Sequence, residues 1–189
     1  MVTLADADIQ VYDVVTCFED VIESKLTFAH NMKKLAESCF CHLRQHRSVH
    51  RSVTTDAVKT LVHALISSRV DDCNSVLYGV CEVHLRPLQS VLNAAARLIA
   101  GKRKFDHIAS TMRNDLHWFP VRQRILFKLS TLVSKCLRRT APSYLIDMCI
   151  PVSTASGRLC LRSCSRRDLR IPRSRLSRYG SHSFSVSGQ

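Results

Sequence analysis

Seven basic side chains in the middle of the chain are of the types that bind phosphate. Four of them cluster around the end of one predicted helix and three follow on the next: Arg97, Lys102, Arg103, Lys104, Arg122, Arg124 and Lys128. Arginine and lysine contact a nucleic-acid backbone without reading its bases. We therefore take these seven as candidate nucleic-acid-binding residues. A solvated basic surface with no ligand is the alternative interpretation.

Two aromatic residues, Trp118 and Phe119, stand between these groups of cations. Their rings could stack on a base or a ribose. A single tryptophan directly before a helix more commonly fills the core, because its ring buries a large apolar surface. We favour the core interpretation for Trp118.

Asp71 and Asp72 are adjacent, and paired aspartates hold the metal ions of polymerases and nucleases. In a polymerase such a pair lies at a tight turn between two apolar strands. In this chain the pair lies within a predicted helix, where neighbouring side chains point about 100° apart. We therefore expect a solvated helix face and no metal site.

A second group of candidate metal ligands combines histidines at four-residue spacing with two thiols one turn earlier: His42, His46, His50, Cys39 and Cys41. On an unbroken helix they would share a face and could hold zinc. No further ligand pair completes the set, since Cys160 and Cys164 lie among the arginines near the end of the chain. Buried thiols and solvated histidines are the favoured interpretation.

Motifs for nucleophilic catalysis are missing from the sequence. It has no Gly-x-Ser-x-Gly elbow and no glycine-rich phosphate loop, and it contains five glycines in all. We therefore predict no catalytic residue, no cofactor and no enzymatic activity.

The elements that must position these residues are helices. Apolar residues recur at three- and four-residue steps in four segments, which cover about 26–47, 54–78, 86–100 and 120–136. Pro87 suits the first turn of the third helix, and Gly101 suits its end. A short turn after Pro142, with Tyr144, Leu145 and Met148, would close the core. The predicted fold is all-α: a bundle of four to five helices with an irregular basic C-terminal tail.

Charge divides the chain into three parts. Residues 1–24 carry six acidic side chains and no Lys or Arg, so all 28 basic residues follow them and the net charge is +13. Residues 158–178 contain eight arginines and one acid, with Leu169, Arg170 and Ile171 as a short strand candidate. We predict segments 1–25, 26–150 and 151–189, the last a flexible Arg/Ser-rich tail.

Cysteine usage and hydropathy indicate the compartment. Nine cysteines, an odd number without a leader-like start, suggest free thiols in a reducing environment. No apolar run reaches the length of a membrane span. We expect an intracellular protein, nuclear or cytoplasmic, with no membrane partner.

Several runs, taken in order, resemble the C-terminal part of reverse transcriptases from non-LTR (LINE-type, jockey-like) retrotransposons. They are Thr54–Ile66, Cys73–Gly79, Leu88–Ile99, Leu116–Ile125, Ala141–Leu145, Pro172–Leu176 and Phe184–Val186, with Tyr179 and Gly180 between the last two. The resemblance extends from about Ser24 to Val186. It implies that residues 1–25 correspond to a degraded end of the polymerase palm and that the helices correspond to the thumb and the region after it.

The family's catalytic aspartates lie in an aromatic-Ala-Asp-Asp hairpin upstream of this region, and that sequence is absent. The resemblance therefore implies a fragment of an RNA-directed DNA polymerase without catalytic residues. Its expected partners are RNA, DNA or an RNA–DNA hybrid, bound non-specifically through the backbone, and a catalytic palm and fingers fragment. A helical remnant or interaction protein with no retained activity is the alternative, and a sequence-specific helix-turn-helix regulator is a third.

Overall fold

The computed structural model describes residues 2–4, 7–9, 14–17, 20–23, 28–72, 77–154, 168–172 and 184–187. The described part is mostly helical, as the sequence predicts. Most of the Arg-rich tail lies outside the described residues, as do Cys160, Cys164 and the run 73–76.

Two short antiparallel hairpins precede the helices, and the all-α prediction omits them. Strand β1 (Val2–Leu4) pairs with β2 (Ala7–Ile9), and β3 (Val14–Cys17) pairs with β4 (Asp20–Glu23). Each pairing is local, since both strands of a hairpin lie within ten residues of sequence.

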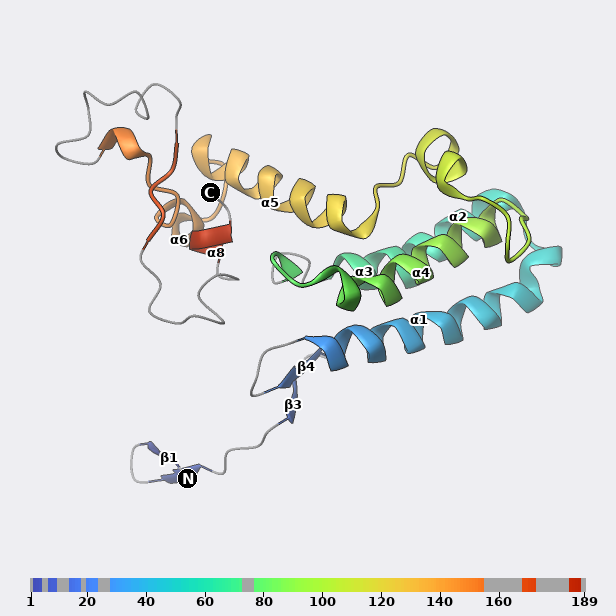
Figure 1. The fold of residues 1–189 in the computed structure, drawn as a ribbon, viewed down its shortest axis with the longest axis horizontal. Helices are drawn as coiled ribbons and strands as arrows, with labels where there is room; N and C mark the ends of the chain where they lie inside the picture. Colours follow the sequence, from blue (N-terminus) through green and yellow to red (C-terminus); the bar gives the residue numbers. More distant parts are fainter. Residues whose placement is uncertain are drawn as a thin grey trace.

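Three helical segments form the centre of the fold (Figure 1). Helix α1 (Ala29–Val49) is followed by the turn η1 (His50–Ser52), and helix α4 (Glu82–Ile99) lies beside α1 and runs in the same direction. The segment between them runs back in the opposite direction. The carboxyl ends of α1 and α4 therefore lie at the same end of the molecule.

The returning segment is one helical stretch with a wide turn in its middle. It consists of α2 (Thr55–Val62), the π-helical turn η2 (His63–Ser67) and α3 (Ser68–Asp71). Thr54 caps it as expected, because its side chain accepts a hydrogen bond of 3.4 Å from the Ala57 N–H. The helix ends at Asp71, earlier than predicted.

Helix α4 begins at Glu82, so the prediction that Pro87 occupies its first turn was wrong. Cys81 has an extended backbone and acts as the N-cap, which places Pro87 in the second turn. Proline lacks an N–H, so the Val83 carbonyl has no donor from position 87. Val83 is exposed, and water can satisfy that carbonyl.

The end of α4 follows the prediction. Gly101 has a φ of +62°, and the Lys102 N–H donates to the Arg97 carbonyl at 2.9 Å. This is the geometry of a helix that ends at a left-handed glycine. It turns the chain toward the basic run that follows.

Replacing Gly101 with alanine is expected to destabilise the fold by about 1 kcal/mol, because a side chain disfavours a left-handed backbone. A Cβ at this position meets no atom within 4 Å, so steric overlap adds nothing. Asparagine tolerates this conformation better, so Gly101→Asn should cost less. Urea denaturation of the two variants checks the order, and equal losses would contradict it.

Helix α5 (Val121–Leu137) opens after Pro120 as predicted, and the π-helical turn η4 (Thr111–Asp115) leads into it. The short helix α6 (Ser143–Ile146) follows, but it does not close the core. Tyr144 and Met148 are exposed, and α6 has no buried residue. A four-residue helix presents too little apolar surface to cover the bundle, so this prediction was wrong.

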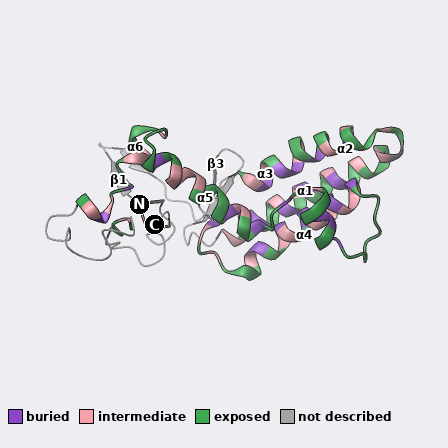
Figure 2. Cartoon of the chain, turned by 90° about the horizontal axis from the view of Figure 1, so that it is seen from above, coloured by how far each residue is buried: buried purple, intermediate pink, exposed green. Residues whose placement is uncertain are grey.

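The main core lies between α1, the α2–η2–α3 stretch and α4, and it extends to the first half of α5 (Figure 2). Its fully enclosed side chains include Val62, Ile66, Val70, Leu88 and Leu92. Leu61 lies in the predicted helix 54–78, three residues after the buried Val58, yet it is exposed. The buried apolar residues of the returning segment repeat every four positions, so only a narrow apolar stripe faces α1 and α4.

A second, smaller buried group lies outside this core: Cys136, Cys149 and Val152. Two backbone hydrogen bonds join it to the next described segment. The Val152 N–H donates to the Asp168 carbonyl at 2.9 Å, and the Arg170 N–H donates to the Ile150 carbonyl at 2.8 Å. The predicted strand piece at Leu169 is thus an isolated bridge to Pro151. The turn η5 (Val152–Thr154) and helix α8 (Phe184–Ser187) complete the described elements.

Candidate nucleic-acid interface

A groove of about 600 Å³ runs between the carboxyl-terminal parts of α1 and α4. Apolar side chains from both helices line it: Phe40 and Leu43 from α1, and Ala94 and Leu98 from α4. Five cations and a histidine line it as well: Arg44, Arg47, Arg97, Lys102, Lys104 and His50. We call it the basic groove.

Helix α1 supplies a face that the sequence prediction did not include. Phe40, Arg44 and Arg47 follow one another at steps of four and three residues, so they share one side of the helix. Arg44 and Arg47 are exposed beside the groove. Their helical spacing was visible in the sequence, but the sequence did not show that this side of α1 faces the end of α4.

Three predicted residues join them from the other wall. The Arg97 Nε–H donates to the Asp106 carbonyl at 3.2 Å, and the Lys102 ammonium donates to Thr111 Oγ1 at 2.6 Å. The Lys102 ammonium also donates to the His107 carbonyl at 3.5 Å. These bonds orient both side chains and leave at least one N–H donor on each. The Lys104 ammonium lies 5.4 Å from the centre of the Phe105 ring, which is 88% exposed.

Arg103 belongs to the same run but does not line the basic groove. Its backbone N–H donates to Asp106 Oδ2 at 2.7 Å, which fixes the turn, and the residue is exposed. It stands beside the groove, where it adds to the positive field.

The electrostatics of the groove favour an anion. Among the described residues that line it there is no Asp or Glu. The carboxyl ends of α1 and α4 contribute partial negative charge, equivalent to about half an elementary charge per helix. Five full positive charges exceed that contribution, so the field at the groove is positive.

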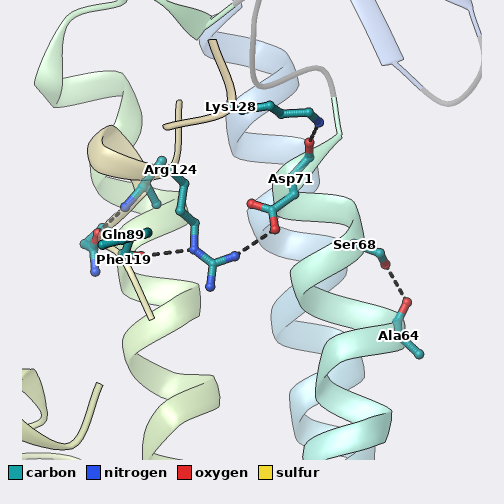
Figure 3. A network of polar contacts seen from close by, with 8 residues as sticks. Ala64, Ser68, Asp71, Gln89, Phe119, Arg124 and Lys128 are labelled. Atoms are coloured by element: carbon teal, nitrogen blue, oxygen red, sulfur yellow. Dashed lines mark hydrogen bonds and ion pairs between the residues drawn. The ribbon is translucent and has the colours of Figure 1, made fainter. Parts of the chain in front are cut away.

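The other three predicted residues lie on α5, where they join that helix to the rest of the fold, and Figure 3 shows two of them, Arg124 and Lys128. The Arg124 Nη1 is 2.8 Å from Asp71 Oδ2, and the Lys128 Nζ donates to the Asp71 carbonyl at 2.6 Å. The Arg124 side chain is only 12% exposed. Arg122 pairs with Glu82 at 3.2 Å, and both of those side chains are largely exposed.

The structure thus divides the seven candidates. It brings Arg97, Lys102 and Lys104 together with Arg44 and Arg47, and it uses Arg124 to hold α5 against α3. We therefore exclude Arg124 from the candidate phosphate contacts. Asp71 is also not the solvated residue that the sequence predicts, because it lies at the end of α3 and pairs with a partner 53 residues away.

Trp118 belongs to the core, as favoured from the sequence. It is 6% exposed, its ring meets His63 edge to face at 5.4 Å, and the Arg124 guanidinium lies 5.5 Å from the ring centre. Phe119 is exposed and contacts the exposed Phe127 at 5.5 Å between ring centres. Phe119 lies just before α5 and Phe127 lies on it, and both rings line a second groove of about 450 Å³ together with Arg124, Lys128 and Lys135. This second groove shares no lining residue with the basic groove.

The candidate metal ligands and the cysteine thiols were the other groups that could carry chemistry. No group of three metal-ligating side chains occurs in the described part of the chain, and the histidines and thiols of α1 do not converge. Burial raises the pKa of the Cys39 thiol, with Arg69 opposing the shift. Burial and a hydrogen bond to Cys136 raise the pKa of Cys149 to about 11. Both thiols stay protonated at neutral pH, which makes them poor nucleophiles.

Comparisons with protein-family models, curated proteins and solved structures found no match for this chain. Among the helices that the structure describes, none is both long enough and apolar enough to cross a membrane.

Proposed function

We propose that this chain binds the phosphate backbone of nucleic acid without reading its sequence, and that it does so through the basic groove. The observation that carries the proposal is the convergence of five cations from α1, α4 and the following loop on one acid-free groove. Phosphate contacts of this kind position a polyanion but carry no base information.

We further propose that the chain derives from the thumb and post-thumb region of a non-LTR retrotransposon reverse transcriptase. The ordered series of matching runs supports this origin, and a mostly helical fold is compatible with it. Such a fragment would have no polymerase activity of its own. Its partners would be RNA, DNA or a hybrid of the two, together with a separate palm and fingers fragment.

Replacing two groove lysines with glutamine is expected to weaken binding to every nucleic acid. In the K102Q/K104Q variant, the slope of log affinity against log salt concentration should become shallower by about two. Each lost phosphate contact means that the nucleic acid releases about one counterion fewer on binding. Affinity near 0.1 M salt should fall about tenfold or more. Fluorescence anisotropy with labelled duplex DNA and RNA–DNA hybrid measures both quantities.

The matched control is K33Q/K34Q, which removes the same charge from exposed positions on α1. Position 34 lies ten residues before Arg44, about 15 Å along the helix axis. If the two double variants weakened binding equally, the affinity would reflect a diffuse attraction between the nucleic acid and the net charge of the protein, and not the basic groove. No binding by the intact chain at low salt would overturn the proposal and favour a remnant without activity.

A further inference from the structure

The basic groove has a feature that backbone binding does not require. A patch for phosphate alone needs cations, yet apolar side chains from both helices also line this groove. Phe40 is the aromatic member, and it is 37% exposed. The groove therefore offers an apolar surface to a ligand that already carries negative charge.

We propose that the basic groove takes an unpaired nucleotide of single-stranded nucleic acid, with its base against Phe40 and its phosphates on the surrounding cations. This inference rests on the proposed function and deepens it. Stacking on an aromatic side chain accepts any base, because every base has a flat π face. The combination of a cationic groove and an aromatic platform is that of proteins that bind single strands.

The geometry of α1 places the stacking ring and two phosphate-binding arginines in one line. Arg44 lies one turn beyond Phe40 on α1, and Arg47 lies a further three residues along the same face. From Phe40 to Arg47 is about 10 Å along the helix axis. Arg97 and Lys102 stand on the opposite wall, so a base on the ring would have cations on both sides.

A second exposed ring extends this surface. Phe105 is 88% exposed and directly follows Lys104, whose ammonium contacts its face. An exposed phenylalanine beside a phosphate-binding lysine can hold the neighbouring base of the same strand.

A duplex satisfies only half of this site. Between its two ends its bases are stacked on one another and present only their edges, so its outer surface offers sugars and phosphates to the cations. Phe40 should therefore matter for single strands and not for duplexes.

The experiment compares Phe40→Ala with wild type in the full chain. Anisotropy titrations use a labelled oligo-dT, an oligo-U and a blunt DNA duplex at one salt concentration. Single-strand affinity should fall about fivefold or more, as expected from the loss of one stacked base, while duplex affinity should change less than twofold. Oligo-dT and oligo-U distinguish a DNA strand from an RNA strand as the ligand.

Tyr144→Ala is the matched control, since this ring is 63% exposed on α6 and lines neither the basic groove nor the groove beside Phe127. Circular dichroism establishes that all variants remain folded, and Phe40→Tyr, which retains a ring for stacking, should restore single-strand affinity. Single-strand affinity unchanged in Phe40→Ala would overturn the inference, as would equal losses for duplex and single strand.

The K102Q/K104Q variant separates the two proposals. If it loses affinity while Phe40→Ala does not, backbone binding stands and the stacking site is refuted. If neither variant changes affinity, both proposals fail. Stronger competition by vesicles of anionic lipid than by oligo-dT would assign the groove to a membrane surface and would also overturn the inference.

Discussion

Replacing Leu92 with alanine is expected to lower the free energy of unfolding by about 3 kcal/mol. Leu92 is fully enclosed in the main core, on the helix that packs against α1, α2 and η2. The substitution removes buried apolar groups and leaves a cavity that the surrounding helices fill only in part. Since a domain of this size is stable by about 5–15 kcal/mol, the loss is a large part of the total.

The same substitution at Leu126 serves as the control. Leu126 lies on α5 with 45% of its surface exposed, so Leu126→Ala should change the free energy of unfolding by about 0.5 kcal/mol or less. Urea denaturation followed by circular dichroism measures both variants against wild type. Similar midpoints for the two variants would show that α1, α4 and the segment between them do not pack as described.

The positions of the helices were predictable where local patterns decide them. The apolar periodicity of α1 and α5 and the glycine at position 101 place these elements to within a few residues. The predicted start of α4, near residue 86, is about four residues too late, because proline is most common in the first turn of a helix. Proline in the second turn removes one backbone hydrogen bond and crowds the carbonyl four residues earlier, and whether the rest of the fold offsets that cost depends on tertiary packing, which no local pattern encodes.

The sequence predicts one wall of the basic groove and not the other. Arg97, Lys102 and Lys104 are close in sequence, so their convergence follows from one helix end. Arg44 and Arg47 join them through the packing of α1 beside α4, which no local pattern encodes. A search of the sequence for arginines at helical spacing finds Arg44 and Arg47. It does not show that they face the end of α4.

Arg124 is a residue that the sequence predicts as a phosphate contact and that the structure places elsewhere. By type and position it resembles a phosphate contact, yet its nearest acid is far away in sequence and beside it in space. A cation that is 12% exposed has little access to a ligand. Its role is therefore to stabilise the junction between α3 and α5, and that role can be tested separately from binding.

Asp71→Asn is expected to destabilise the fold by about 2 kcal/mol, because it removes the carboxylate that neutralises a largely buried guanidinium. Arg124 would keep the hydrogen bond from its Nε–H to the Phe119 carbonyl, and Lys128 would keep its bond to the backbone of residue 71. The loss therefore reports the carboxylate of residue 71 and not these two contacts.

Glu82→Gln makes the same chemical change in the Arg122 pair, whose side chains are 70% and 59% exposed. Solvent screens that pair, so its loss should cost about 0.5 kcal/mol or less. Urea denaturation at low and high salt distinguishes the two ion pairs further, since salt screens exposed charges more than buried ones. High salt should therefore reduce the effect of Glu82→Gln more than that of Asp71→Asn. Equal losses for Asp71→Asn and Glu82→Gln would mean that Arg124 is as solvated as Arg122, and would return it to the candidate phosphate contacts.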